Sequence, residues 1–223
     1  MASWMVHLRI ADRLLEQIPG LSPTEFIVGN IAPDSGVPNE DWSAFSPPTK
    51  VSHFKTGTQK AGPEAFASKY FTCAQRENYA PRQFSFYLGY LTHLLTDRLW
   101  SEQIALPSFR KHIGGEPPYN GPKAWEIKDD WYDLDFKFLR NHPDFRGFQI
   151  YQGAVDFRND YMEEFSPDAF DNRRQYITSF YLQDKDNLDR TYLYLTETEM
   201  DSFVDASARE ILDILHTYYS LNL

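Results

Sequence analysis

His93 and Asp97 are of the types, and at the spacing, that could bind one metal ion. They lie four residues apart in Gln83–Trp100, a segment with helical periodicity. Residues at this spacing lie one above the other on a helix, with Cβ atoms about 5–6 Å apart, so an imidazole and a carboxylate can share an ion. For an isolated pair, a buried hydrogen bond that orients a core helix is the more common explanation. Further residues of ligand type elsewhere in the chain would favour the metal site over the hydrogen bond.

Two candidates precede this segment. His7 lies on the apolar side of a helix predicted over Ser3–Ile18, where an unpaired imidazole is costly. Asp34 follows a second helix, which begins at Ser22 and breaks near Pro33. Taken singly, a hydrogen-bonded core histidine and a turn aspartate are common explanations for them.

His53 is a third candidate. It lies in Val37–Lys60, a long irregular stretch of the kind that is often functional, although a surface histidine is an open alternative there. Three histidines and two aspartates are enough for a two-metal site with an open position for water. Zn²⁺ suits these ligand types, while Mn²⁺ and Fe²⁺ stay open because mixed nitrogen and oxygen sites discriminate weakly. The candidate set is His7, Asp34, His53, His93 and Asp97.

The elements that must position these residues are helices. Gly89 precedes His93 by four residues on the same helical face, and a glycine inside a helix usually has a packing reason. We expect it to let a second helix or a loop approach the His93 face. Few convincing strands are present, so the predicted fold class is all-α. Further helices are predicted over Glu64–Arg76, Pro122–Asn141 and Glu197–Tyr219.

Composition narrows the class of protein. The 223 residues are 42% hydrophobic and carry a formal net charge of −10, which argues against binding to nucleic acid or to an anionic membrane. No apolar run is long enough to span a bilayer, and the amphipathic N-terminal segment does not resemble a signal peptide. The single cysteine, Cys73, suits a reducing compartment. These features predict a cytoplasmic protein.

Other catalytic patterns do not occur. The chain contains no HExxH, CxxC, G-x-S-x-G or phosphate-binding glycine loop. It also lacks a His-Asp dipeptide, which counts against the HD phosphohydrolases, another all-α metal family.

Four motifs, in this order, resemble the zinc-dependent phospholipase C family. They are HLRIADRLLE from His7, GNIAPDS ending beside Asp34, SHF around His53 and YLGYLTHLLTD ending at Asp97. The resemblance covers about the first hundred residues and fades beyond Trp100. It implies an all-helical, phospholipase C-like metal-binding core, which we place at residues 1–143, followed by a helical C-terminal extension at residues 144–223 that packs on it.

The resemblance also implies roles for individual residues. The family binds up to three zinc ions and hydrolyses phosphodiesters or phosphomonoesters, and related zinc nucleases share its fold. By this likeness the main ion would be held by His53, His93, Asp97 and Asp34, and a neighbouring ion by His7 and Asp97. Asp34 would also be the general base.

The chain departs from the family at two points. Secreted members use an N-terminal tryptophan as a zinc ligand, whereas Trp4 is internal here, and the family's later histidine site is not clear. His112 and Glu116 have its spacing, but two glycines lie between them. We therefore predict that the aspartate-rich segment KDDWYDLD completes the site, with Asp130 as the first choice, Asp133 second and His112 third. A solvated acidic helix face is the alternative.

The predicted function is a metal-dependent hydrolase of phosphate esters that uses a metal-activated water. The expected substrate is a small-molecule or lipid phosphate ester. Two alternatives stay open: a non-catalytic helical binding protein with a structural or vestigial metal site, and a nuclease or phosphatase of the same fold. The charge of −10 disfavours the nuclease.

Overall fold

The computed structural model describes residues 1–41, 43–57, 61–119 and 121–221. The all-α prediction is confirmed, because helices dominate and the only strands in the described residues form one two-residue antiparallel pair. In chain order the elements are α1 (Trp4–Gln17), α2 (Pro23–Ile31), the 3₁₀ turn η1 (Ala32–Asp34), β1 (Val37–Pro38), β2 (Phe45–Ser46), α3 (Thr49–Ser52), α4 (Pro63–Tyr70), α5 (Cys73–Arg76), α6 (Pro81–Trp100), the π-helical turn η2 (Ser101–Ala105), α7 (Leu106–His112), α8 (Pro122–Asn141), α9 (Arg146–Gly153), α10 (Ala169–Tyr181) and α11 (Glu197–Tyr219).

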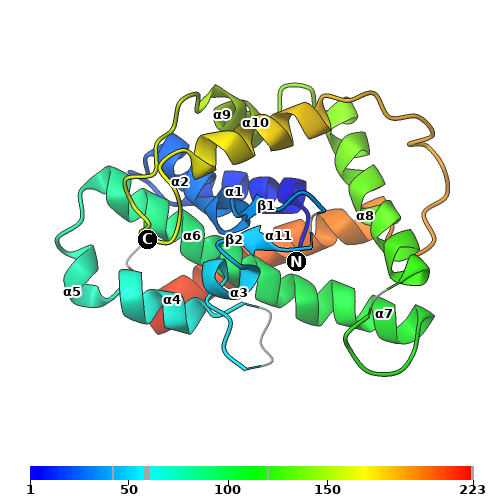
Figure 1. Ribbon diagram of the computed structural model, residues 1–223, viewed down its shortest axis with the longest axis horizontal. Helices are drawn as coiled ribbons and strands as arrows, with labels where there is room; N and C mark the ends of the chain where they lie inside the picture. The colour runs from blue at the N-terminus through cyan, green and yellow to red at the C-terminus, as the bar shows by residue number, and fades with distance from the viewer. Residues whose placement is uncertain (42, 58–60, 120, 222–223) are drawn as a thin grey trace.

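Helix α6 runs through the middle of the molecule, with the other helices around it (Figure 1). Every residue from Ser85 to Asp97 is buried, because the helix is apolar on nearly all sides and neighbours cover each of them. Among the helices of the described residues, none is long and apolar enough to cross a membrane.

Two glycines set the distance between α2 and α6. A Cβ atom built on Gly89 would lie 2.2 Å from the carbonyl oxygen of Phe26, and one built on Gly29 would lie 2.2 Å from that of Phe86. The backbones therefore touch at both points, as expected for Gly89. This contact brings the last turn of α2, which precedes Asp34, against the His93 face of α6.

Replacing Gly89 with alanine should force the two helices apart. The added methyl meets backbone, which cannot rotate away, so we expect a loss of about 1–3 kcal/mol or more in the free energy of unfolding. Gly153→Ala is the matched control, because its Cβ would meet nothing within 4 Å. Chemical denaturation of the two variants compares them. Equal stabilities would show that the helices are not held together at Gly89.

Several helix boundaries differ from the predictions. The segment Glu64–Arg76 forms two helices rather than one, because Thr72 caps a new helix through its side chain. Pro107 lies in the first turn of α7, where a missing N–H is tolerated. The stretch Val37–Lys60 contains the strand pair and α3, while residues 42 and 58–60 lie outside the described residues.

The helices after residue 144 pack into the same hydrophobic core as α1 and α6. Tyr181 of α10 accepts a hydrogen bond from the backbone N–H of Met5 at 3.2 Å, and α11 lies along α1, where Arg9 pairs with Asp201. The helices α9, α10 and α11 thus contribute to the same core as the helices before them. A boundary between two units at residue 143 stays a prediction.

Candidate metal centre

The five predicted ligand residues converge from four segments of the chain. His7 comes from α1, Asp34 ends η1, His53 follows α3, and His93 and Asp97 come from α6. Their side chains are buried: four are at most 1% exposed, and Asp34 is 8% exposed. Nitrogen and oxygen atoms of two overlapping triplets, His7–His93–Asp97 and Asp34–His53–His93, lie within 4.8 Å of one another.

Four of these residues surround one point at distances that suit zinc. His53 Nε2 lies 3.3 Å from His93 Nε2, 3.3 Å from Asp34 Oδ1 and 3.5 Å from Asp97 Oδ2. His93 Nε2 lies 4.0 Å from Asp34 Oδ1 and 3.8 Å from Asp97 Oδ2. Ligands of a tetrahedral zinc ion, each about 2.0–2.1 Å from the metal, are about 3.4 Å apart, and the distances from the two histidines to each other and to the carboxylates are close to this spacing.

Hydrogen bonds at the far side of each ring orient two of the histidines. His93 Nδ1 donates to the carbonyl oxygen of Asn30 at 2.7 Å, which leaves the lone pair on Nε2. His53 Nδ1 is 2.9 Å from the Ser52 hydroxyl. In both cases the nitrogen that faces the cluster is Nε2. This is the arrangement of metal-binding histidines, whose second nitrogen is held by an outer partner.

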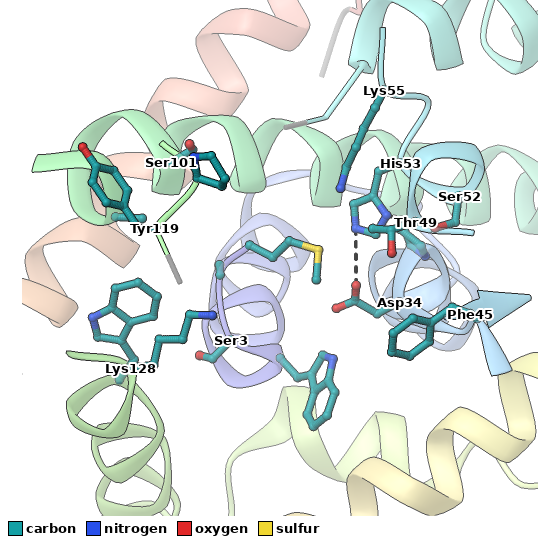
Figure 2. Close-up of a pocket in the computed structure, with 18 of the residues that line it drawn as sticks. Ser3, Asp34, Phe45, Thr49, Ser52, His53, Lys55, Ser101, Tyr119 and Lys128 are labelled. Atoms are coloured by element: carbon teal, nitrogen blue, oxygen red, sulfur yellow. Dashed lines mark hydrogen bonds and ion pairs between the residues drawn. The ribbon is translucent and has the colours of Figure 1, made fainter. Parts of the chain in front are cut away.

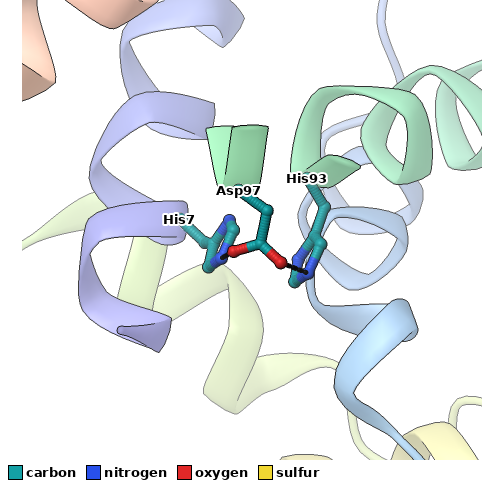
Figure 3. A group of neighbouring side chains, drawn as sticks. All are labelled: His7, His93 and Asp97. Atoms are coloured by element: carbon teal, nitrogen blue, oxygen red, sulfur yellow. Dashed lines mark ion pairs between the residues drawn. The ribbon is translucent and has the colours of Figure 1, made fainter. Parts of the chain in front are cut away.

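Asp97 also reaches a second position beside His7. Figure 3 shows its carboxylate reaching from His7 to His93, whose rings stack with centroids 3.8 Å apart. Asp97 Oδ1 lies 3.5 Å from His7 Nε2 and accepts the backbone N–H of Ala2 at 2.9 Å. Both ring nitrogens of His7, and Asp97 Oδ2, have no hydrogen-bond partner in the described part of the chain. Buried polar atoms without partners are costly, and a bound cation would satisfy them.

The charges in this cluster suit metal binding at neutral pH. Burial and the nearby His7 lower the pKa of His93 to about 3, so its ring is neutral and its lone pair is free for a metal. Burial would raise the pKa of Asp34, but the hydrogen bond from His53 and the nearby histidines outweigh it and hold that pKa well below its usual range. The pKa of Asp97 is lowered as well: burial opposes this, but the chain's amino terminus and His7 prevail. Two ionised carboxylates thus lie beside the neutral ring of His93.

The cluster opens into a cavity of about 760 Å³. Asp34 and His53 form part of its wall, and Figure 2 shows the two side chains facing one another there. His7, His93 and Asp97 lie behind them and do not line the cavity. An apolar wall from η2, α7 and α8 includes Leu106, Phe109 and Trp131. A substrate entering this space would therefore meet the cluster at Asp34 and His53.

The aspartate-rich helix does not join the cluster, which corrects the prediction for Asp130. Asp130 is buried, but its Oδ1 pairs with Arg190 at 2.6 Å and its Oδ2 accepts the backbone N–H of Tyr194 at 2.7 Å. Asp133 pairs with the same guanidinium and with Lys185. His112, the third choice, packs edge-on against the Tyr194 ring. The cost of burying these carboxylates is thus offset by arginine and lysine rather than by a metal.

Asp135 is a buried carboxylate of a different kind. It accepts hydrogen bonds from Ser3 Oγ at 2.8 Å and Tyr181 OH at 2.7 Å, with no cation in ion-pair contact among the described residues. Burial raises its pKa to about 7, against the effect of these hydrogen bonds. Because the folded state then holds a proton that the unfolded chain releases near pH 4, this group costs stability as the pH rises from 4 to 7.

Asp135→Asn should remove that loss. Each unit of pKa shift corresponds to about 1.4 kcal/mol. Between pH 4 and 8 the zinc-free variant should therefore lose less stability than the zinc-free wild type, by about 2 kcal/mol or more. Denaturation curves measured across this range would show the difference. Asp129→Asn, at an exposed position on the same helix, is the control. Parallel pH profiles for the wild type and Asp135→Asn would contradict the raised pKa.

The fold and the cluster together define an all-helical protein with a buried histidine–aspartate cluster of the kind that could hold a metal ion. The sequence model described as zinc dependent phospholipase C matches residues 6–218, and the chain belongs to this family. The match reaches far beyond the first hundred residues, in which the motifs lie. No curated protein and no solved structure matched the chain.

Proposed function

We propose that this protein is a zinc-dependent phosphoesterase that cleaves a phospholipid, or a closely related phosphate ester, in the cavity beside Asp34 and His53. The observation that carries the proposal is the convergence of five ligand-type side chains, with unpartnered buried atoms on His7 and Asp97, at the wall of an open cavity. Membership of a zinc-dependent phospholipase C family gives the reaction class.

The residues present fit zinc. His53, His93, Asp34 and Asp97 would hold one ion, and His7 with the other oxygen of Asp97 would help to hold a second. Bound zinc would supply an activated water and positive charge beside the phosphate. We propose one to three bound ions, and zinc rather than Mn²⁺ or Fe²⁺.

Asp34 has the position of a catalytic residue as well as a ligand. Among the five it is the one carboxylate on the cavity wall, and its low pKa keeps it ionised at neutral pH. It can therefore accept a hydrogen bond from an attacking water and orient it. So low a pKa makes Asp34 a weak base. A bound zinc ion would lower the pKa of the water, so that even a weak base could accept its proton, and we assign that role to Asp34.

The apolar wall would bind the hydrophobic part of the substrate. Leu106, Phe109 and Trp131 line the same cavity as Asp34 and His53. An ester with one charged and one apolar end suits such a site better than a nucleic acid does. The net charge of −10 also opposes binding of a polyanion to the surface of the protein. A cytoplasmic location stays a prediction.

Hydrolysis of esters by protein loaded with zinc tests the proposal. Chromogenic phosphodiesters and phosphomonoesters and short-chain phospholipids should be cleaved, with activity lost on chelation and recovered on adding zinc. His53→Ala should abolish activity, whereas His216→Ala, an exposed histidine on α11, should not. Zinc-loaded protein that cleaves none of these esters would instead favour a non-catalytic binding protein with a structural metal site.

A further inference from the structure

More cationic than acidic side chains line the cavity, although the protein is strongly acidic. Three cationic side chains line it, Lys55, Lys128 and Arg173, whereas Asp34 is the one carboxylate among its described lining residues. The whole chain has a net charge of −10. The acidic residues are thus kept out of this space, and Asp34 itself belongs to the metal cluster. Bound zinc would make the cavity still more positive.

Among the three cationic side chains, Arg173 gives the strongest indication of an anion-binding site. It is 7% exposed, and its Nη2 donates to the carbonyl oxygen of Gly36 at 2.6 Å. Its guanidinium lies over the rings of Trp4 and Tyr176, 5.9 and 5.4 Å from their centroids. Within the described residues no carboxylate lies within ion-pair distance of it, in contrast to Arg174, which pairs with Asp171 at 2.7 Å.

Burying a guanidinium without a carboxylate beside it lowers the stability of the folded protein, because the charge loses its hydration. Arginine has five N–H donors, and one carbonyl oxygen satisfies one of them. Arg173 also lines the cavity, so an anion there could reach it. Planar, fixed donors of this kind suit the oxygen atoms of a phosphate or a carboxylate.

The two lysines approach from opposite sides. Figure 2 shows Lys55 near His53 and Lys128 across the cavity on α8, each with its amino group directed inward. Both side chains are half-buried. Their charges are therefore less screened than those of surface lysines. Together with Arg173 they place positive charge on several sides of one ligand.

We propose that the cavity selects phospholipids whose head group carries an additional anionic group, such as a second phosphate, over those with a cationic head group such as choline. This inference rests on the proposed function, which places the scissile phosphate beside Asp34 and His53. Arg173, Lys55 and Lys128 bind the additional group. Lipids with one and two phosphates then differ in binding energy inside the cavity, where charges interact more strongly than in water.

Three aromatic side chains of the cavity, those of Trp4, Phe109 and Trp131, are poorly placed to hold a choline head group. Quaternary ammonium ions bind over open aromatic faces, away from other cations. Here Arg173 already lies over Trp4, and the Phe109 and Trp131 rings pack against each other with centroids 5.6 Å apart. Two lysine amino groups would also repel a trimethylammonium group.

Hydrolysis rates on two lipids test this selectivity. Zinc-loaded protein is given dioctanoyl phosphatidylinositol 4-phosphate and dioctanoyl phosphatidylcholine as monomers, and kcat/KM is compared. We expect the anionic lipid to be preferred by about tenfold or more, and the preference to fall at least tenfold in Arg173→Gln and in Lys128→Gln. Lys123→Gln is the control, because Lys123 is on the same helix but does not line the cavity. Melting temperature and zinc content verify each variant.

A binding measurement separates this inference from the proposed function. Calorimetry with zinc-free protein and inositol 1,4-bisphosphate should show binding that weakens about tenfold in Arg173→Gln or, if that variant does not fold, in Lys128→Gln. Equal or greater activity on phosphatidylcholine, or a preference that neither variant changes, would overturn the selectivity and leave the phosphoesterase standing. No cleavage of either lipid, with bisphosphate binding retained and sensitive to Arg173, would overturn the phosphoesterase but leave an anion-binding cavity. No cleavage and no binding would overturn both.

Discussion

Asp97→Asn should lose bound zinc at both positions of the cluster and lower the melting temperature with it. Asp97 offers Oδ2 to the point shared by His53 and His93 and Oδ1 to His7, so one side chain serves both groups of ligands. An asparagine keeps the shape but removes the charge and replaces one oxygen with an N–H₂ donor. When the free zinc concentration is about 1,000 times the Kd of a site, binding adds about 4 kcal/mol to the stability of the folded protein. This contribution should disappear in Asp97→Asn.

Elemental analysis and thermal unfolding of Asp97→Asn, with and without added zinc, measure the two effects together. Asp130→Asn is the matched control, because it also removes a buried carboxylate. It should lose stability through its broken pair with Arg190 but keep its zinc. Full zinc content and an unchanged melting temperature in Asp97→Asn would mean that His93 and Asp97 only orient a core helix.

Asp34→Asn should lose catalytic activity more than it loses metal. Asp34 lies on the cavity wall at the edge of the cluster, and the position beside His7 and Asp97 does not involve it. We expect kcat/KM to fall by about 10²-fold or more, the usual range for removing a general acid or base, while part of the zinc is retained. Steady-state kinetics and zinc analysis on the same preparation test this. Asp41→Asn, an exposed aspartate in the following loop, is the control.

Loss of all zinc together with activity would make Asp34 an obligatory ligand and leave its separate catalytic role unsupported. Retained activity would remove it from the site altogether. The two outcomes are distinguishable because metal content and rate are measured independently.

The sequence predicted those parts of the site that depend on local spacing. The four-residue step from His93 to Asp97 sets both side chains on one helical face, and the glycine before them indicated the close helix contact found at Gly29 and Gly89. The convergence of His7, Asp34 and His53 on this face could be expected from the resemblance and is what the structure shows. Their roles as ligands stay predictions.

The errors came from contacts between distant parts of the chain. Asp130 resembled a ligand because a buried carboxylate needs a cation, but the cation is Arg190, sixty residues later and in an irregular segment. No spacing rule pairs such residues. The orienting partners Asn30 and Ser52 stood within the quoted motifs, yet their roles depend on backbone and ring directions. Arg173 gave no signal at all in the sequence, since only the fold brings it to the cavity.

The measurement that tests the metal centre most directly is anomalous diffraction at the zinc absorption edge from crystals of the protein grown with zinc. We expect one peak bounded by His53 Nε2, His93 Nε2, Asp34 and Asp97, and a second peak beside His7. No peak is expected at Asp130. A map without a peak at the cluster, from protein that elemental analysis also finds free of zinc, would contradict the metal centre.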